Sequence, residues 1–144
     1  MTEVQFHFNV ADRLVYACRL LRKAVRSGTR VAVTAPPATL TRLDRALWTF
    51  DPQEFLPHLL VRAGEPVPPR LRRTPVWLVE RADLAAQHTV LVYLGEQPAE
   101  GFESFSRLIE IVSTDPAERE AARLRWKHYA GRGYAIAKFE AAAP

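Results

Sequence analysis

Hydrophobic and polar residues alternate strictly at the start of the chain. Residues 4–10 read Val-Gln-Phe-His-Phe-Asn-Val, the two-residue period of a β-strand that buries one face and leaves His7 on the polar face. The next apolar residues recur at the three- and four-residue spacing of a helix: Leu14, Cys18, Leu21 and Val25. Asn9 or Asp12 can cap this helix, and Ser27-Gly28 can end it. The chain therefore opens with a strand and an amphipathic helix.

A second kind of strand follows, in which apolar residues do not alternate. Residues 30–35 contain Val-Ala-Val, which is typical of a strand covered on both faces of a parallel sheet. Further strands are predicted at residues 75–79, 89–94, 108–112 and 135–139, and the segment 89–94 is apolar enough to be central. Strands that alternate with helices predict an α/β fold, a single doubly wound, mostly parallel sheet with helices on both faces.

The segment 43–58 joins the end of a helix to a cluster of aromatic residues. Its helical half continues an apolar stripe formed by Leu40, Leu43 and Leu47. Asp51-Pro52 ends this helix, because proline disfavours the helical conformation in the residue before it. Three aromatic side chains are crowded around the exit: Trp48, Phe50 and Phe55. They can seal the end of a core, or some can point outward as anchors for a partner protein.

The last predicted helix carries a line of positive charge. It begins at Asp115-Pro116, a capping residue followed by a proline suited to the first turn, and extends to about residue 130. Arg119, Arg123 and Lys127 are spaced four residues apart on one face, next to Trp126. Cations beside an aromatic side chain suit a peptide that ends in a free carboxylate after an apolar residue. A solvated basic helix surface is the alternative.

Composition narrows the class of protein. A length of 144 residues predicts one domain, residues 1–144, and an apolar fraction of 48% is that of a globular protein. The net charge of +4 permits contact with nucleic acid or an acidic partner without requiring it. Cys18 is the only cysteine and is predicted to be a core residue. No secretory signal or membrane-spanning segment is recognised, so we expect a cytoplasmic protein.

The patterns of common catalytic and ligand-binding sites are missing. The turns that follow the first two strands contain no glycine, so neither a P-loop nor a dinucleotide fingerprint is present, and the fold is expected to be Rossmann-like without a nucleotide-binding loop. The four histidines do not have metal-ligand spacing. We therefore expect no catalytic residue, cofactor or metal ion. An α/β enzyme with a cryptic site remains an alternative.

Direct binding of single-stranded nucleic acid is a further alternative. Residues 59–73 form the loosest segment, predicted as an exposed loop rich in proline. This loop contains Arg70, Arg72 and Arg73, which could contact phosphates together with the basic residues of the first helix.

Two motifs resemble a known family, the chi subunit of bacterial DNA polymerase III. The first is Leu43-Asp-x-Ala-Leu-Trp48 followed by Phe55-Leu-Pro-His58, and the second is Arg123-Leu-Arg-Trp-Lys-His-Tyr-Ala-Gly-Arg-Gly-Tyr134. With the order of the elements, the resemblance covers essentially the whole chain. It implies a non-catalytic clamp-loader subunit, in a fold that has lost nucleotide binding.

The resemblance also implies two partners and two sites. One partner is the psi subunit, bound as a one-to-one heterodimer where it exists, with Leu47, Trp48, Phe55 and Pro57 at the interface. The other is the acidic C-terminal tail of single-stranded-DNA-binding protein. Its predicted site consists of Arg119, Arg123, Trp126, Lys127, Gly133 and Tyr134. The resemblance implies that DNA is contacted mainly indirectly and that no membrane is bound.

Overall fold

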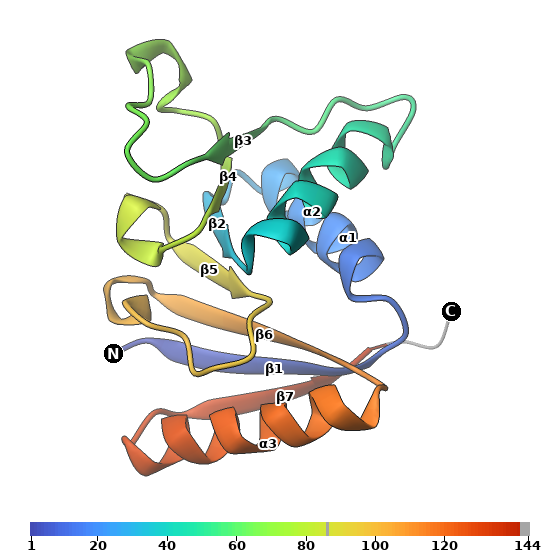
Figure 1. Ribbon diagram of the computed structural model, residues 1–144, viewed down its shortest axis with the longest axis vertical. Helices are drawn as coiled ribbons and strands as arrows, with labels where there is room; N and C mark the ends of the chain where they lie inside the picture. The colour runs from blue at the N-terminus through green and yellow to red at the C-terminus, as the bar shows by residue number, and fades with distance from the viewer. Residues whose placement is uncertain (86, 142–144) are drawn as a thin grey trace.

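One parallel sheet forms the centre of the protein (Figure 1). The structure is a computed structural model, and it describes residues 1–85 and 87–141. The strands are β1 (Glu3–Val10), β2 (Val31–Thr34), β3 (His58–Val61), β4 (Val76–Val79), β5 (Val90–Tyr93), β6 (Arg107–Ser113) and β7 (Ile136–Glu140). Their order in the sheet is β3-β4-β2-β5-β6-β1-β7, and each neighbouring pair is parallel. The predicted α/β fold is confirmed, and β5 is the middle strand, as its sequence predicts.

Helices cover both faces of the sheet. They are α1 (Arg13–Arg26), α2 (Pro37–Thr49) and α3 (Pro116–Gly131). Short 3₁₀ turns lie between successive strands from β3 to β6: η1 (Pro69–Leu71), η2 (Ala82–Ala85) and η3 (Phe102–Ser104). Successive strand residues point to opposite faces, so Ile109 and Ile111 pack in the core under α1 and α2, whereas Leu108 and Val112 pack on the side of α3. Figure 1 shows α3 below the edge of the sheet formed by β1 and β7.

The helix starts follow from their capping residues. Asp12 caps α1 by accepting a hydrogen bond from the backbone N–H of Val15 at 3.1 Å, so Asp12 and not Asn9 is the cap. Asp115 caps α3 in the same way, with the N–H of Glu118 at 3.0 Å. Gly28 ends the turn after α1 with a φ of 77°, a left-handed conformation that glycine adopts without strain.

The prediction that β1 buries only one face is wrong. Gln5 and His7, expected on a solvated face, are each only 9% exposed. The reason is that β1 lies between β6 and β7 and that Tyr16 of α1 packs against His7 on this face. His7 shares hydrogen bonds with the hydroxyl of Tyr16 from α1 and with the side chain of Gln5, and its ring centroid lies 5.1 Å from that of Phe139.

The prediction of an exposed loop over residues 59–73 is also wrong for its first residues. His58–Val61 forms the edge strand β3, which pairs with β4 so that Leu59 lies opposite Trp77. Pairing with a strand more than a dozen residues away supplies the hydrogen bonds that a four-residue segment cannot supply itself.

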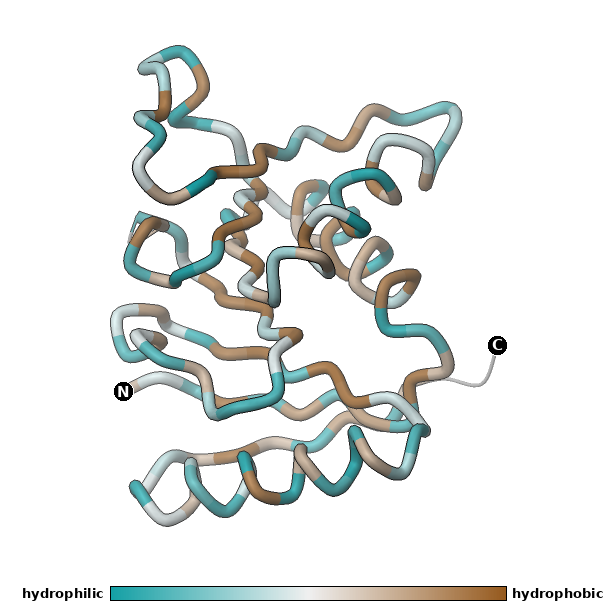
Figure 2. The backbone as a smooth tube through the Cα atoms, in the orientation of Figure 1, coloured by the Kyte–Doolittle hydropathy of each residue, from teal (hydrophilic) through white to brown (hydrophobic). Residues whose placement is uncertain are grey.

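Hydrophobic residues are distributed as this layered architecture requires. Figure 2 shows polar residues along much of α3, which buries only Ala122, Arg125 and Tyr129. Among the residues described, no helix has both the length and the apolar composition needed to cross a bilayer. The helix α3, with its largely polar and exposed surface, borders the site described next.

Candidate functional site

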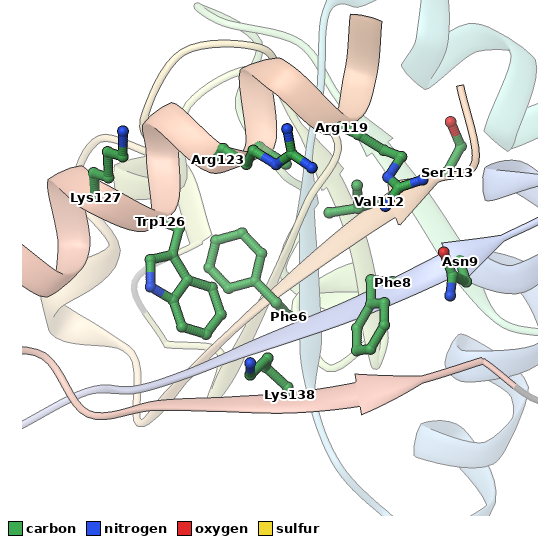
Figure 3. A pocket seen from close by; sticks show the side chains of 11 residues that line it. Phe6, Phe8, Asn9, Val112, Ser113, Arg119, Arg123, Trp126, Lys127 and Lys138 are labelled. Atoms are coloured by element: carbon green, nitrogen blue, oxygen red, sulfur yellow. The ribbon is translucent and has the colours of Figure 1, made fainter. Parts of the chain in front are cut away.

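A cleft of about 450 Å³ lies between α3 and the adjoining strands (Figure 3). Apolar side chains from β1, β6 and α3 line it: Phe6, Phe8, Val112, Ala122 and Trp126. Cations from α3 and β7 line it as well: Arg119, Arg123, Lys127 and Lys138. Asn9 and Ser113 add polar groups. The cleft therefore joins an apolar surface to positive charge supplied from both sides.

The local geometry of each element explains this arrangement. Phe6 and Phe8 are two residues apart on β1 and so point to the same face of the sheet. Trp126 packs against Phe6 with ring centroids 5.0 Å apart, and the Nζ atom of Lys138 lies 5.5 Å from the centroid of the Trp126 ring. This distance places Lys138 within cation–π range of Trp126. In Figure 3 the ring of Trp126 faces Phe6, and Lys138 approaches both from β7.

The cations of α3 are available to a ligand. Arg119 and Lys127 form no ion pair with any residue that the structure describes. Arg123 forms one with Glu120 at 3.3 Å, but both side chains are about two-thirds exposed, so this pair contributes little free energy. Figure 3 shows the Arg119 side chain extending toward Val112 and Ser113. An anionic group bound here would meet guanidinium groups at the edge of an apolar surface.

The structure brings together four of the six residues predicted for this site. Arg119, Arg123, Trp126 and Lys127 all line the cleft. Gly133 and Tyr134 do not line it, because they follow the end of α3, where the Tyr134 ring packs 5.0 Å from Phe102. Six other lining residues were not predicted from the sequence: Phe6, Phe8, Asn9, Val112, Ser113 and Lys138. The signal that could have found two of them is the alternation of the first strand, which places Phe6 and Phe8 on one face.

A buried network fixes the position of α3 against the sheet. Glu110 of β6 has no exposed surface, and Arg125 Nε donates to its two carboxylate oxygens at 3.0 and 3.1 Å. The hydroxyl of Tyr129 donates to Glu110 at 2.7 Å and accepts from the backbone N–H of Ala99 at 2.9 Å. Arg125 also donates to the carbonyl of Glu96 at 3.1 Å. These bonds hold the helix that carries the cations of the cleft.

Burial raises the pKa of the Glu110 carboxyl, and the neighbouring Arg125 guanidinium acts in the opposite direction. The charge of Arg125 is thus what makes an ionised carboxylate tolerable at this position.

The aromatic residues of segment 43–58 divide between surface and core. Trp48 is 60% exposed and Phe55 is 64% exposed, and their ring centroids lie 5.6 Å apart, so they form one exposed aromatic patch. Phe50 is half-buried against the core with the Arg22 guanidinium 4.9 Å from its ring centroid. Two of the three aromatics therefore point outward and one inward.

The other predicted interface residues lie deeper. Leu47 is only 3% exposed, in the core beneath α2, and Pro57 is half-buried. Leu47 can therefore support the aromatic patch from below but cannot itself reach a partner.

A second cleft, of about 620 Å³, lies at the carboxyl ends of the strands, where doubly wound proteins commonly bind ligands, and Arg13, Leu94 and Glu118 are among its lining residues. Arg13, which follows β1, forms an ion pair with Glu118 of α3 and donates to the carbonyl of Leu94 at 2.7 Å. Arg13 therefore links the carboxyl end of β1 to that of β5, on the other side of β6. Among the described residues, no group of three or more histidine, cysteine, aspartate and glutamate side chains is placed to hold a metal ion.

Comparison with known proteins identifies the family. Residues 1–137 match the family described as DNA polymerase III chi subunit, HolC. The chain is 35% identical to the DNA polymerase III subunit chi of Pseudomonas aeruginosa, over 94% of each chain. It is 30% identical to that of Haemophilus influenzae, over 82% of this chain and 80% of the relative. For Escherichia coli the identity is 27%, over 81% and 78%. The chain belongs to the family of DNA polymerase III chi subunits.

Proposed function

We propose that this chain is a non-catalytic accessory subunit of the replicative DNA polymerase III assembly, acting in the cytoplasm as a single domain. In this role it links the clamp loader, through psi, to the C-terminal tail of single-stranded-DNA-binding protein. Family membership supports the accessory role, since three relatives are each named subunit chi of DNA polymerase III. The geometry of the cleft supports the assignment of the tail.

The observation that carries the tail assignment is the convergence of charge and apolar surface in one cleft. A protein tail that ends in an apolar residue presents a ring or alkyl group next to a free carboxylate. Phe6 and Trp126 would accept the apolar side chain, while Arg119 and Arg123 would hold the carboxylate or neighbouring acidic residues. Lys138 completes the positive rim from the opposite side.

Fluorescence anisotropy of a labelled acidic peptide tests this assignment. The peptide ends in Pro-Phe with a free carboxylate, and the control peptide has the same sequence with an amidated end. We expect saturable binding that is weakened by amidation and by rising salt, because part of the affinity is electrostatic. Equal binding of the two peptides would contradict a carboxylate site.

The Arg123→Ala variant tests the residue directly. Loss of the Arg123 guanidinium should weaken binding of the tail by about 1–3 kcal/mol, the range for a hydrogen bond to a charged group. Arg45→Ala is a matched control, because Arg45 is an exposed arginine of α2 that forms no ion pair with any described residue. If both variants bound the tail as the parent does, the site would lie elsewhere.

The aromatic patch of Trp48 and Phe55 is the proposed contact with psi. Large exposed aromatic side chains are the anchors that interfaces commonly bury at their centre. The double variant W48A/F55A should lose one-to-one complex formation in a titration with psi followed by size exclusion. Leu124→Ala is the matched control, since Leu124 is 61% exposed on the distant α3. Loss of the complex in the control alone would refute this placement.

A further inference from the structure

Four arginines near the amino ends of β2 and β4 remain outside the two proposed protein contacts. Arg70, Arg72 and Arg73 lie in the segment 62–75, and Arg30 directly precedes β2. We call these four residues the arginine patch. None of them forms an ion pair within the described part of the chain. The segment 62–75 contains a single acidic residue, Glu65, so its positive charge is not compensated locally.

The patch is held in place by the backbone around it. The side chain of Arg30 donates to the carbonyl of Arg72 at 2.6 Å, which ties the loop to the start of β2. The loop itself is folded by turn hydrogen bonds from Leu71 to Pro68, at 2.9 Å, and from Thr74 to Leu71, at 3.1 Å. Prolines at 66, 68 and 69 further restrict its backbone. A ligand would therefore meet arginines that lose little backbone freedom on binding.

One arginine of the patch, Arg30, acts on a buried neighbour, His88. His88 is 3% exposed, and its pKa is lowered to about 4, mainly by burial and further by the charge of Arg30. The backbone of Thr74 acts in the opposite direction on this pKa. The charge of Arg30 is thus close enough to His88 to disfavour its protonated form.

The patch differs from the α3 cleft in having no exposed apolar anchor. The large hydrophobic side chains that are exposed in the described chain are Met1, Val15, Trp48, Phe55, Leu124 and Phe139, and none lies in segment 62–75. Charge without an apolar anchor is poorly suited to the centre of a protein interface, where aromatic and apolar residues carry the binding energy. It is suited to a phosphate backbone, which is recognised by arginine through charge and hydrogen bonds alone.

We propose that the arginine patch binds the phosphate backbone of single-stranded DNA, without reading its sequence. The choice of single-stranded DNA over other polyanions rests on the proposed function, which brings the protein to DNA coated with single-stranded-DNA-binding protein. Figure 1 shows the loop that carries the patch, in green, at the end of the molecule opposite α3. A strand held at the patch would therefore leave the cleft free, and both could be bound at once.

The number of arginines sets the salt dependence. Each phosphate contact with a single strand contributes about 0.7 to the slope of log K against log salt, so four contacts predict a slope of about −3. The segment 62–75 contains no aromatic residue on which a base could stack, so we expect weak binding. The phosphate contacts should make this binding fall steeply as salt rises from about 50 to about 200 mM.

Anisotropy of a labelled oligothymidylate of about 20 nucleotides, titrated with the full chain, tests the proposal. The triple variant R70A/R72A/R73A should reduce the slope by about 2 and weaken binding at least roughly tenfold at about 50 mM salt. The control R19A/R42A/R45A removes three exposed arginines of α1 and α2 that form no ion pair with any described residue, and so loses the same charge. It should keep most of the parent slope. Equal losses in the two triple variants would overturn the proposal.

Two further arms separate this inference from the tail assignment. R119A/R123A should lose the tail peptide and keep the oligothymidylate, whereas R70A/R72A/R73A should do the reverse. A parent protein that binds the tail peptide but no oligothymidylate would refute the arginine patch and leave the proposed function standing. Tighter binding to a polyglutamate peptide of equal charge than to the oligothymidylate would also overturn the proposal.

Discussion

The buried ion pair of Arg125 and Glu110 makes the sharpest prediction about stability. Replacing Arg125 with methionine keeps most of the volume of the side chain and removes its charge and donors. The change deletes the two bonds from Nε to the Glu110 carboxylate and the bond to the Glu96 carbonyl. It leaves Glu110, with no exposed surface, dependent on the hydroxyl of Tyr129.

The expected cost follows from this burial. Arg125 is 5% and Glu110 0% exposed at the side chain, and removing one partner of a buried pair typically costs about 3–5 kcal/mol. That loss is a large share of the ~5–15 kcal/mol by which a domain is usually stable. The double variant R125M/E110Q also removes the buried, unpaired charge of Glu110 and should recover about half of the lost stability.

Urea unfolding of the parent, R125M and R125M/E110Q at several pH values measures these differences. Burial raises the folded-state pKa of Glu110, so the folded protein binds this proton more tightly than the unfolded chain. The deficit of R125M should therefore be largest at neutral pH and should shrink as the pH falls through the raised pKa. A deficit below about 1 kcal/mol, or one that is constant with pH, would show that the pair does not hold α3 as described.

Three further predictions concern other parts of the chain. His7 and His88 have folded-state pKa values lowered to about 4 from 6.5, so the unfolded chain takes up their protons first and stability should fall as the pH drops from about 6.5 to about 4. In His88→Phe the unfolding free energy, measured with urea at these two pH values, should drop by less than in the parent, with a difference on the order of 2 kcal/mol. W48A/F55A should leave the unfolding free energy within about 1 kcal/mol of the parent, because both side chains are exposed; a larger loss would mean that the patch is part of the core. Lys138→Ala should weaken tail-peptide binding by about 0.5–1 kcal/mol in the anisotropy titration. Unchanged affinity would show that Lys138 takes no part in binding the peptide.

The sequence was informative where the signal is local. Spacing located α1 and α3. The capping residue Asp115 predicted where α3 begins, and the start of α1 was narrowed to Asn9 or Asp12, of which Asp12 is the cap. The cations of α3 could be placed on one face because helical geometry alone determines which residues are neighbours. The apolar runs of β2 and β5 likewise predicted strands buried on both faces.

The sequence failed where distant segments decide the outcome. Alternation in β1 could not show that β7 and α1 would cover Gln5 and His7. Lys138 lies on β7 and Phe6 on β1, and their place in one cleft with Trp126 depends on strand order. The sequence gives no sign that Glu110 pairs with Arg125, because the two residues lie 15 positions apart, on β6 and α3. Gly133 and Tyr134 were carried over from a motif, and the exit of α3 directs Tyr134 toward Phe102 instead.

The most direct test of the cleft uses the indole signals of the three tryptophans, Trp48, Trp77 and Trp126. In ¹⁵N-labelled protein each gives a separate N–H resonance, which the variants W48F and W126F assign. Titration with the tail peptide should shift the Trp126 signal, and the amidated peptide should shift it less at equal concentration. The Trp48 and Trp77 signals should stay in place, since one lies in the distant aromatic patch and the other is buried. A shift at Trp48 with none at Trp126 would contradict the assignment of the tail to the α3 cleft.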